Sequence, residues 1–307
     1  MSYRPRPQAQ ALPNILTVDV EDWYTSSLDL FPDSDVSHGS KPDESVVENT
    51  RRVLEMLEHY GHTATFFVLG TVAEHYPQVV QEIADRGHEV ASHGYGHYLL
   101  YNLTPEEFRE DVRKSVMFLC QAGVETVRGY RAAYWSITKR SLWALNVLAE
   151  EGFQYDSSIF PIRRGLYGIP HAPTATYRVN WDGGDGIVEI PPTTWPILGQ
   201  NLPIAGGGYL RLMPYGIIVR LIRKMNSKGL PAVMYMHPYE LDPADIKTLH
   251  TVRSGKSWLS LLLQRMNRST SPRKIQQLLK DIKFVSIASA LEKLEPKHTV
   301  HLRTLLG

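Results

Sequence analysis

The stretch Asn14-Ile15-Leu16-Thr17-Val18-Asp19-Val20-Glu21-Asp22 decides the fold of this chain of 307 residues. It begins as a short, mostly apolar and β-branched run, which predicts a buried strand, and it ends in acidic residues. Carboxylates at the carboxyl end of a buried strand are typical of α/β barrels, where functional groups gather on the loops after the strands. A barrel also requires further strands that alternate with helices.

The rest of the chain shows this alternation. A helix starts at Thr104-Pro105-Glu106-Glu107, where Thr104 and Glu107 form a capping box. Such alternation predicts a parallel sheet or an α/β barrel. The further strands are predicted near 64–69, 88–92, 125–128, 154–155, 232–236 and 283–286, and the other helices near 43–60, 72–86, 138–151, 212–228, 273–280 and 287–294.

The segment 163–208 departs from that pattern, because prolines and glycines multiply there. Within it, 174–180 and 187–190 flank Asp182-Gly183-Gly184-Asp185 and predict a hairpin. We interpret the segment as a β-rich insertion in a single domain over 14–307, a length that suits a barrel of about 250 residues with extensions. Residues 1–13 contain three prolines and are predicted to form a flexible arm. The stretch 241–273 is polar and gives no assignment.

Composition limits the function. Lys and Arg (33) balance Asp and Glu (32), so the chain as a whole has no general attraction for nucleic acid or an anionic membrane. No apolar run approaches the roughly 18 residues of a membrane span, and the first residues carry no secretory signal, so we expect a cytoplasmic protein without a transmembrane segment. The one cysteine, Cys120, lies in an apolar stretch and is predicted to be a core thiol. The oligomeric state is not indicated.

Two histidines follow the predicted strand 88–92. The motif His93-Gly94-Tyr95-Gly96-His97 sets two imidazoles four residues apart with glycines between them, so that a loop can aim both at one cation. Two histidines and one carboxylate would leave positions on a divalent metal open for water and substrate. The alternative is a pair of ordinary loop histidines.

The acids Asp19, Glu21 and Asp22 also allow two interpretations. They form either a solvated loop cap or a functional cluster whose mutual repulsion is compensated by Arg131 or by a metal. His237 follows the apolar stretch 232–236. It is either a functional group at a strand end or a core histidine with satisfied hydrogen bonds.

Taken in order, these motifs resemble the NodB-like polysaccharide deacetylases, carbohydrate esterase family 4. The resemblance covers roughly 14–290. It is carried by Thr17-Val-Asp-Val-Glu-Asp22, Ala64-Thr-Phe-Phe-Val68, Ser92-His-Gly-Tyr-Gly-His97, Arg128-Gly-Tyr-Arg-Ala-Ala-Tyr134 and Met236-His-Pro238. Three further segments resemble more particularly the branch found with exosortase and exopolysaccharide gene clusters: Asp156-Ser-Ser-Ile-Phe-Pro161, Glu189-Ile-Pro-Pro192 and Gly206-Gly-Gly-Tyr209.

The resemblance implies a distorted (β/α)7-type barrel that holds one divalent metal, commonly zinc. His93 and His97 would be metal ligands. The third ligand would come from Glu21 or Asp22, because the adjacent acid pair usual in the family is spread here into Asp-Val-Glu-Asp.

The resemblance also implies the catalytic roles. Asp19 would be the general base, oriented by Arg131. His237 would be the general acid, tethered by Asp156. The backbone N–H of Tyr134 would help to form an oxyanion hole.

Two more departures from the family concern the pocket. Ala133 replaces the proline expected before Tyr134, and Ser157 stands where a tryptophan often follows the acid that corresponds to Asp156. Both leave the implied chemistry intact and bear on the shape of the pocket, hence on substrate choice.

The activity so implied is hydrolysis of N-acetyl groups on an N-acetylated polysaccharide or glycan intermediate, in exopolysaccharide biosynthesis or modification. One alternative is a hydrolase of a small non-sugar amide or ureide on the same fold. Another is a non-catalytic sugar-binding relative, which a missing base or ligand would mark. Trp181 and Trp195 are either platforms for sugar rings or packing residues.

Overall fold

The computed structural model describes residues 13–27, 37–165, 167–242, 266–296 and 298–306. Nearly all of the expected arm 1–13, and most of the unassigned stretch 241–273, lie outside these ranges.

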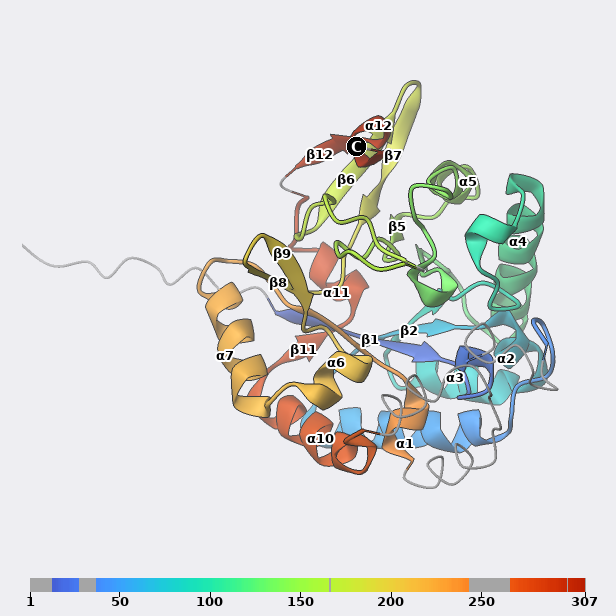
Figure 1. The fold of residues 1–307 in the computed structure, drawn as a ribbon. Coiled ribbons are helices and arrows are strands. Elements are labelled where there is room, and N and C mark those ends of the chain that lie inside the picture. Colours follow the sequence, from blue (N-terminus) through green and yellow to red (C-terminus); the bar gives the residue numbers. More distant parts are fainter. Residues whose placement is uncertain (1–12, 28–36, 166, 243–265, 297, 307) are drawn as a thin grey trace, which may run out of the picture.

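Seven parallel strands form the core (Figure 1), in the spatial order β10-β1-β2-β3-β4-β5-β7. The segment between β7 and β10 closes the ring, because the N–H of Thr193 donates to Val233 O at 3.1 Å and that of Tyr235 to Ala205 O at 2.9 Å. The expected distorted (β/α)7-type barrel is confirmed. The strands are β1 (Asn14–Val20), β2 (Thr65–Val68), β3 (Glu89–Ser92), β4 (Gly129–Tyr130), β5 (Tyr155–Asp156), β7 (Gly184–Glu189) and β10 (Val233–Met236).

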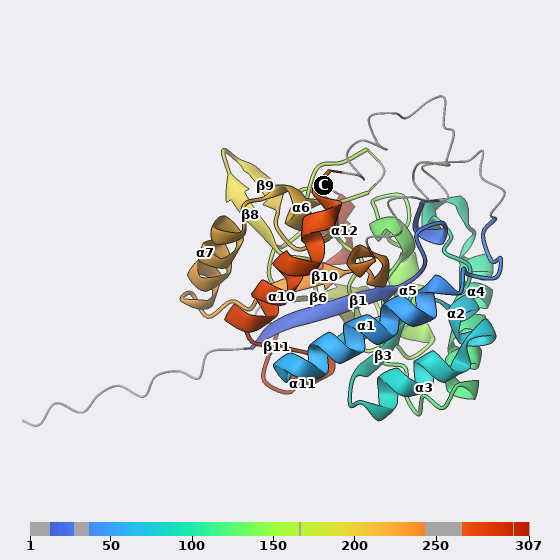
Figure 2. The same cartoon turned by 90° about the horizontal axis from the view of Figure 1, so that it is seen from below.

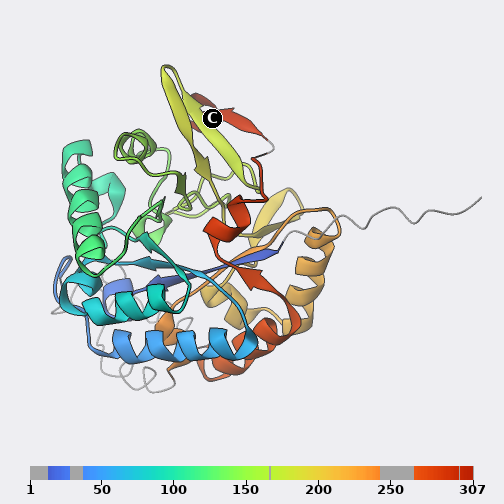
Figure 3. The same cartoon turned by 180° about the vertical axis from the view of Figure 1, so that it is seen from behind.

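Helices cover the outside of the barrel, as Figures 2 and 3 show from below and from behind. Among the described residues, none of these helices is both long and apolar enough to span a bilayer. They are α1 (Ser45–Tyr60), α2 (Gly70–His75), α3 (Pro77–Asp85), α4 (Pro105–Gln121), α5 (Ala144–Glu150), α6 (Gly207–Leu212), α7 (Tyr215–Asn226), α10 (Ser271–Asp281), α11 (Ile287–Leu291) and α12 (Leu302–Leu306). Short 3-10 turns lie at Thr25–Ser27, Leu100–Asn102, Ala133–Trp135, Pro238–Leu241 and Arg268–Thr270.

The remaining strands extend this core. The predicted hairpin is present: β6 (Tyr177–Trp181) pairs antiparallel with β7 and projects from the body beside β12 (Thr299–His301) (Figure 1). Its second strand, β7, is itself a barrel strand. β11 (Phe284–Val285) pairs with the start of β1, and β8 (Thr194–Ile197) with β9 (Gln200–Pro203) forms a separate two-stranded sheet.

Side chains alternate between the two faces of each strand, and this alternation positions the site. In β1, Leu16, Val18 and Val20 pack outward into the apolar core beneath the helices, whereas Ile15 packs inside the barrel. Asp19 has the parity of Ile15 and so points inward, and Glu21 follows it. The first strand thereby delivers two carboxylates to the mouth of the barrel.

Prolines shift the bounds of two predicted helices. The helix expected over 72–86 is split into α2 and α3 at Tyr76, whose φ/ψ of −134°/53° is not helical. Pro77 is the cause, because its ring disfavours a helical conformation in the preceding residue. The helix expected over 212–228 is present as α7 and begins at Tyr215, directly after Pro214, which separates it from α6.

Three smaller expectations fail. The strand expected at 125–128 pairs only at Gly129–Tyr130, and the helix expected over 138–151 is regular only at Ala144–Glu150. Cys120 is exposed, so the prediction of a core thiol is wrong. Phe108, Val112 and Leu119 form the inward, apolar face of α4. Cys120, one position after Leu119, therefore lies on the outer face.

Candidate active site

Polar side chains from several strands meet at one mouth of the barrel, in a cavity of about 360 Å³. The register explains the convergence, because Val20, Val68 and Ser92 lie side by side on adjacent strands, with Met236 beside Val18. Glu21, His93 and His237, which follow β1, β3 and β10, therefore lie at the same mouth. The cavity is lined by residues that include Asp19, Glu21, His93, His97, Tyr134 and His237.

Glu21, His93 and His97 form a buried cluster whose candidate ligand atoms lie within 4.8 Å of one another. Glu21 Oε2 lies 2.7 Å from His97 Nε2 and 3.8 Å from His93 Nε2. The loop between the histidines is held by Asp111, whose carboxylate accepts the N–H groups of Tyr95 at 2.9 Å and Gly96 at 3.0 Å.

The donor chemistry of this cluster fits a divalent cation. Nδ1 of His93 donates to the carbonyl oxygen of Arg131 at 2.8 Å, which turns the unprotonated Nε2 toward the cluster. Burial lowers the pKa of His93, which favours the neutral, ligating imidazole. Glu21 Oε2 is buried, and apart from its 2.7 Å approach to His97 Nε2 no described residue donates a hydrogen bond to it. A cation would satisfy that oxygen.

The ionisation of Glu21 points the same way. Burial opposes the charge on this carboxylate, but the imidazoles of His97, His237 and His93 together outweigh burial and lower its pKa to about 2. Glu21 therefore stays ionised at neutral pH. An ionised carboxylate beside a neutral imidazole is the ligand state that a divalent metal needs.

Asp22, the other acid left open by the sequence, faces away from this cluster. Its carboxylate accepts the N–H of Thr25 at 2.9 Å, the hydroxyl of Thr25 at 2.7 Å and the N–H of Asp43 at 3.2 Å. The alternation along β1 is the reason, since Asp22 has the parity of the outward-facing residues. The structure thus brings Glu21, and not Asp22, to the two histidines.

Arg131 is buried against Asp19. Its Nη1 donates to Asp19 Oδ1 at 2.7 Å and to the Thr17 hydroxyl at 2.7 Å, while Nη2 donates to the Ser157 hydroxyl at 2.8 Å. The guanidinium also lies 4.1 Å from the ring centre of Phe67. These contacts hold the plane of the guanidinium and, through it, the orientation of the Asp19 carboxylate.

His237 faces both acids of β1. Its Nε2 lies 3.4 Å from Glu21 Oε1 and 4.0 Å from Asp19 Oδ2, while Nδ1 lies 2.9 Å from Glu240 Oε1. Burial tends to lower the pKa of His237, but the hydrogen bond that Glu240 accepts from Nδ1 and the charges of Glu21, Glu240 and Asp19 outweigh burial and raise it. The buried Glu240 carboxylate has a lowered pKa, because the same imidazole overcomes its own burial.

The expectation that Asp156 tethers His237 is therefore wrong. Asp156 has the opposite parity to Tyr155, which packs inside the barrel, so its carboxylate points outward. There it accepts the Ser158 hydroxyl and lies beside Glu189. Burial raises the pKa of both carboxyl groups, which favours a shared proton between them.

Tyr134 lies in a strained turn at the wall of the cavity. Its φ of 51° and ψ of 24° are left-handed, and its ring centre lies 4.9 Å from that of His97. Ala133 precedes it in the 3-10 turn Ala133–Trp135. The turn thus directs a backbone segment, as well as a ring, toward the histidine pair.

Sequence reasoning missed several residues that support the site. Glu240 stands three positions after His237, and this spacing in His237-Pro238-Tyr239-Glu240 is that of a capping box, which the structure shows. That signal was available in the sequence. For Asp111, Ser157 and Ser158, no local pattern marks the role, because their partners lie far away along the chain.

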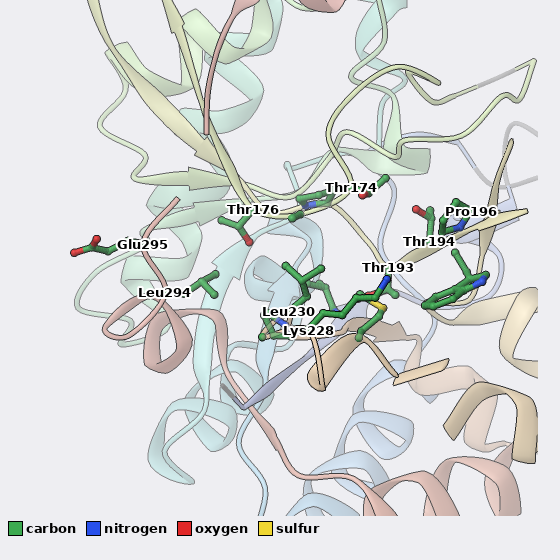
Figure 4. A pocket seen from close by; sticks show the side chains of 16 residues that line it. Thr174, Thr176, Thr193, Thr194, Pro196, Lys228, Leu230, Leu294 and Glu295 are labelled. Carbon is green, nitrogen blue, oxygen red and sulfur yellow. The ribbon is translucent and has the colours of Figure 1, made fainter. Parts of the chain in front are cut away.

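A second cavity, of about 200 Å³, lies beside the root of the β8–β9 hairpin (Figure 4). Its wall contains threonines such as Thr193 and Thr194, with Leu294 and Glu295 on the other side and Lys228 between them (Figure 4). It is lined by no histidine and by one carboxylate among the described residues. Hydrolytic chemistry therefore centres on the first cavity.

Two family models match the chain. Residues 39–155 match the model described as polysaccharide deacetylase, and residues 157–292 match one described as a domain of unknown function, DUF3473. The boundary between the two models falls at β5, inside the single large sheet.

Named relatives match parts of the chain. Over 99 residues it is 32% identical to a peptidoglycan-N-acetylglucosamine deacetylase of Bacillus cereus, which covers 32% of this chain and 36% of that protein. Over 101 residues it is 32% identical to a chitooligosaccharide deacetylase of Bradyrhizobium sp., which covers 33% and 43%. The chain thus spans less than half the length of each of these relatives.

The fold is similar to a crystal structure from Mycobacterium smegmatis described as that of a candidate polysaccharide deacetylase. The TM-score is 0.59 with 22% sequence identity, and the alignment covers 95% of each chain. At this identity, the likeness shows the fold alone.

Proposed function

We propose that this chain, whose residues 39–155 match the family model described as polysaccharide deacetylase, removes N-acetyl groups from an N-acetylated glycan. One observation carries the proposal: the cluster of Glu21, His93 and His97 shares one cavity with the Arg131–Asp19 ion pair and with His237. A ligand set, a base and an acid are then all present around one space.

The metal is part of this proposal. A divalent ion, which we propose to be zinc, would be held by Glu21, His93 and His97, where it would polarise the acetyl carbonyl and acidify water. Asp19 lies beside the cluster and takes a proton from water as general base. Arg131 keeps one Asp19 oxygen engaged, so that the other oxygen, Oδ2, faces the cavity on the side of His237.

His237 supplies the proton that the leaving amine needs. Without that proton the leaving group would be an amide anion, so an acid is required. Glu240 accepts from Nδ1 and thereby directs the Nε2 proton toward the cavity. The backbone N–H of Tyr134 is proposed to stabilise the tetrahedral oxyanion, and donors of this type contribute about 100- to 1,000-fold to rate.

We further propose that the glycan is an exopolysaccharide or one of its biosynthetic intermediates, and that 14–307 acts as one domain. The first point is supported by the segment 206–209, which resembles the exopolysaccharide-associated branch and contributes Gly207, Gly208 and Tyr209 to the cavity wall. The second is supported by the sheet, because strands from both matched segments belong to it.

Acetate release is the test. The full chain, loaded with zinc and separately with other divalent ions, is incubated with a panel of N-acetylated oligosaccharides and with small amides and ureides. We expect acetate from the oligosaccharides, abolished in Asp19→Asn and retained in Asp22→Asn, whose side chain lies outside the cluster. Turnover of the small amides alone would replace the glycan by another substrate class. Tight glycan binding without acetate release would make the chain a binding protein.

A further inference from the structure

The tip of the β8–β9 hairpin exposes apolar side chains that the fold does not use. Leu198 is 99% exposed, and its neighbours Ile197 and Leu202 are 45% and 39% exposed. Figure 2 shows the hairpin projecting from the body next to α7. Single exposed apolar residues are common, but three on one projecting turn form a patch of the kind that marks an interaction site.

The backbone conformation of Leu198 sharpens this observation. The two-residue loop Leu198-Gly199 has φ values of 49° and 77°, so both residues are left-handed. Hairpins of this geometry favour Asn, Asp or Gly at the first position, because a branched side chain is strained there. A leucine in this conformation costs conformational energy, and burial of its side chain within the fold does not compensate for that cost. The side chain is therefore best explained by a contact outside the fold.

The helix beside the hairpin is cationic. No aspartate or glutamate occurs between Ile190 and Tyr239, although acids and bases balance over the chain as a whole. Within that segment Arg220, Arg223 and Lys224 on α7, and Lys228 just after it, are exposed. None of these four cations has a carboxylate oxygen of a described residue within 4.0 Å. Two acids occur in the surroundings of α7: Glu295 lines the second cavity with Lys228, and Asp281 accepts from Tyr215 at the start of the helix.

One residue joins the cationic helix to the apolar tip. Trp195, half-buried at the root of the hairpin, lies beneath Lys224 Nζ at 5.2 Å and Lys228 Nζ at 5.7 Å from its ring centre. On α7, Ile217, Arg220 and Lys224 are spaced i, i+3 and i+7, so they share one exposed face. An apolar tip, an interfacial tryptophan and flanking cations thus follow one another across a single surface.

We propose that this surface, formed by the tip Ile197–Leu202 and the cations of α7, docks the protein on an anionic lipid bilayer. Peripheral proteins bind such membranes with apolar side chains that insert below the headgroups. Lys and Arg side chains then lie at headgroup level, and Trp lies between the two layers. An apolar turn that projects from the body can insert into a deformable bilayer, whereas a protein partner would have to offer it a shaped pocket. The inference goes beyond the proposed function and does not depend on it.

Vesicle sedimentation tests the proposal with the full chain. We expect binding to vesicles of phosphatidylcholine mixed with phosphatidylglycerol, weaker binding as salt rises, and little binding to phosphatidylcholine alone. Leu198→Asn should weaken binding roughly tenfold or more, since one inserted leucine is lost. Asparagine favours the left-handed turn, so this variant keeps the fold. The double variant Arg220→Gln/Lys224→Gln should bind roughly 25-fold more weakly, at about fivefold per cation.

Matched controls lie on other faces of the molecule. Met117→Asn removes an exposed apolar side chain of α4, and Lys139→Gln/Arg140→Gln removes two exposed cations, and both should bind like the unaltered chain. Absence of binding to the anionic vesicles, or equal binding by Leu198→Asn and the unaltered chain, overturns the proposal. In that case the exposed tip of the hairpin would be assigned to binding a protein partner. Acetate release from soluble oligosaccharides should be unchanged in Leu198→Asn, which separates this test from that of the proposed function.

Discussion

Arg131 Nη1 lies 2.7 Å from Asp19 Oδ1, although 112 positions separate the two residues in the chain. The guanidinium reaches Asp19 from the loop after β4, and a third strand end supplies Ser157 as a further partner. A base oriented in this way depends on a planar group that can bond several partners at once.

Arg131→Lys should therefore lower kcat about 10- to 100-fold. A lysine ammonium can keep the bond to Asp19 but cannot also reach Thr17 and Ser157 in the plane of the guanidinium, and a hydrogen bond to a charged group contributes about 1.5–3 kcal/mol. The measurement is acetate release at saturating substrate, with metal content and the urea midpoint recorded alongside. Full activity in the lysine variant would contradict the orienting role.

Metal content should separate ligands from their neighbours. His93→Ala and Glu21→Gln remove members of the buried cluster and should lose most of the bound metal after dialysis, because an open site of three ligands cannot spare one. Asp22→Asn and His237→Ala should retain it. Elemental analysis of the four purified variants decides the matter. Loss of metal from His237→Ala would make that histidine a ligand, and loss from Asp22→Asn would reverse the choice between the two acids.

Glu240 should act as a positioning residue for His237. Glu240→Gln removes the charge that helps to raise the pKa of His237, so the imidazole loses its proton at lower pH than before. We expect kcat to fall about 10- to 100-fold, with metal content retained. The alkaline limb of the pH–rate profile should also move to lower pH.

Asp156→Asn is the control for that experiment, because Asp156 points away from His237. It should leave the alkaline limb where it is, even if stability changes. If the alkaline limb of the pH–rate profile moved in Asp156→Asn and stayed in place in Glu240→Gln, Asp156 would be the residue that positions His237, as the sequence predicted.

Acid should destabilise the fold through two buried histidines. Burial lowers the pKa of His88 to about 4 and also lowers that of His62. Both are neutral acceptors in the fold, since Nδ1 of His88 accepts the N–H of Ala64 at 3.3 Å and Nδ1 of His62 that of Phe284 at 3.2 Å. In the unfolded chain these imidazoles take up protons below about pH 6.5. The free energy of unfolding should therefore fall as pH drops from about 6.5 toward 4.

The urea midpoint measured at pH 7.5 and at pH 5 tests this sign. His88→Gln keeps a neutral acceptor and should show a smaller difference between the two midpoints, whereas exposed His59, replaced in the same way, should leave the difference unchanged. Equal midpoints for the unaltered chain at both pH values would contradict the prediction.

Much of the fold could be predicted because the deciding signals are local. The apolar run 14–18, the capping box at Thr104 and Glu107, and the hairpin around Asp182 each lie within a few residues of one another, and the structure has all three elements. The helix bounds at Pro77 and Pro214 were also encoded locally and could have been anticipated. The exposure of Cys120 follows from the direction of the apolar face of α4.

The site divides differently between sequence and tertiary structure. The sequence by itself determined which side chains follow the strands, and with them the set Asp19, Glu21, His93, His97, Arg131 and His237 that the barrel brings to one cavity. Strand parity also separates Glu21 from Asp22 and turns Asp156 outward, although this requires knowing which face of each strand is the inner one.

Only the tertiary structure decided which side chains from distant strand ends contact one another. The geometry of the bond between Arg131 and Asp19, which the family resemblance implied, and the burial of the Glu21 cluster depend on strand ends that come from distant positions in the chain. The same holds for the surface of α7. The charges of the whole chain balance, but the cations of this helix lie beside the exposed Leu198. Composition averages over the sequence, whereas electrostatic and apolar contacts act over a few ångströms in space, so the fold alone sets them.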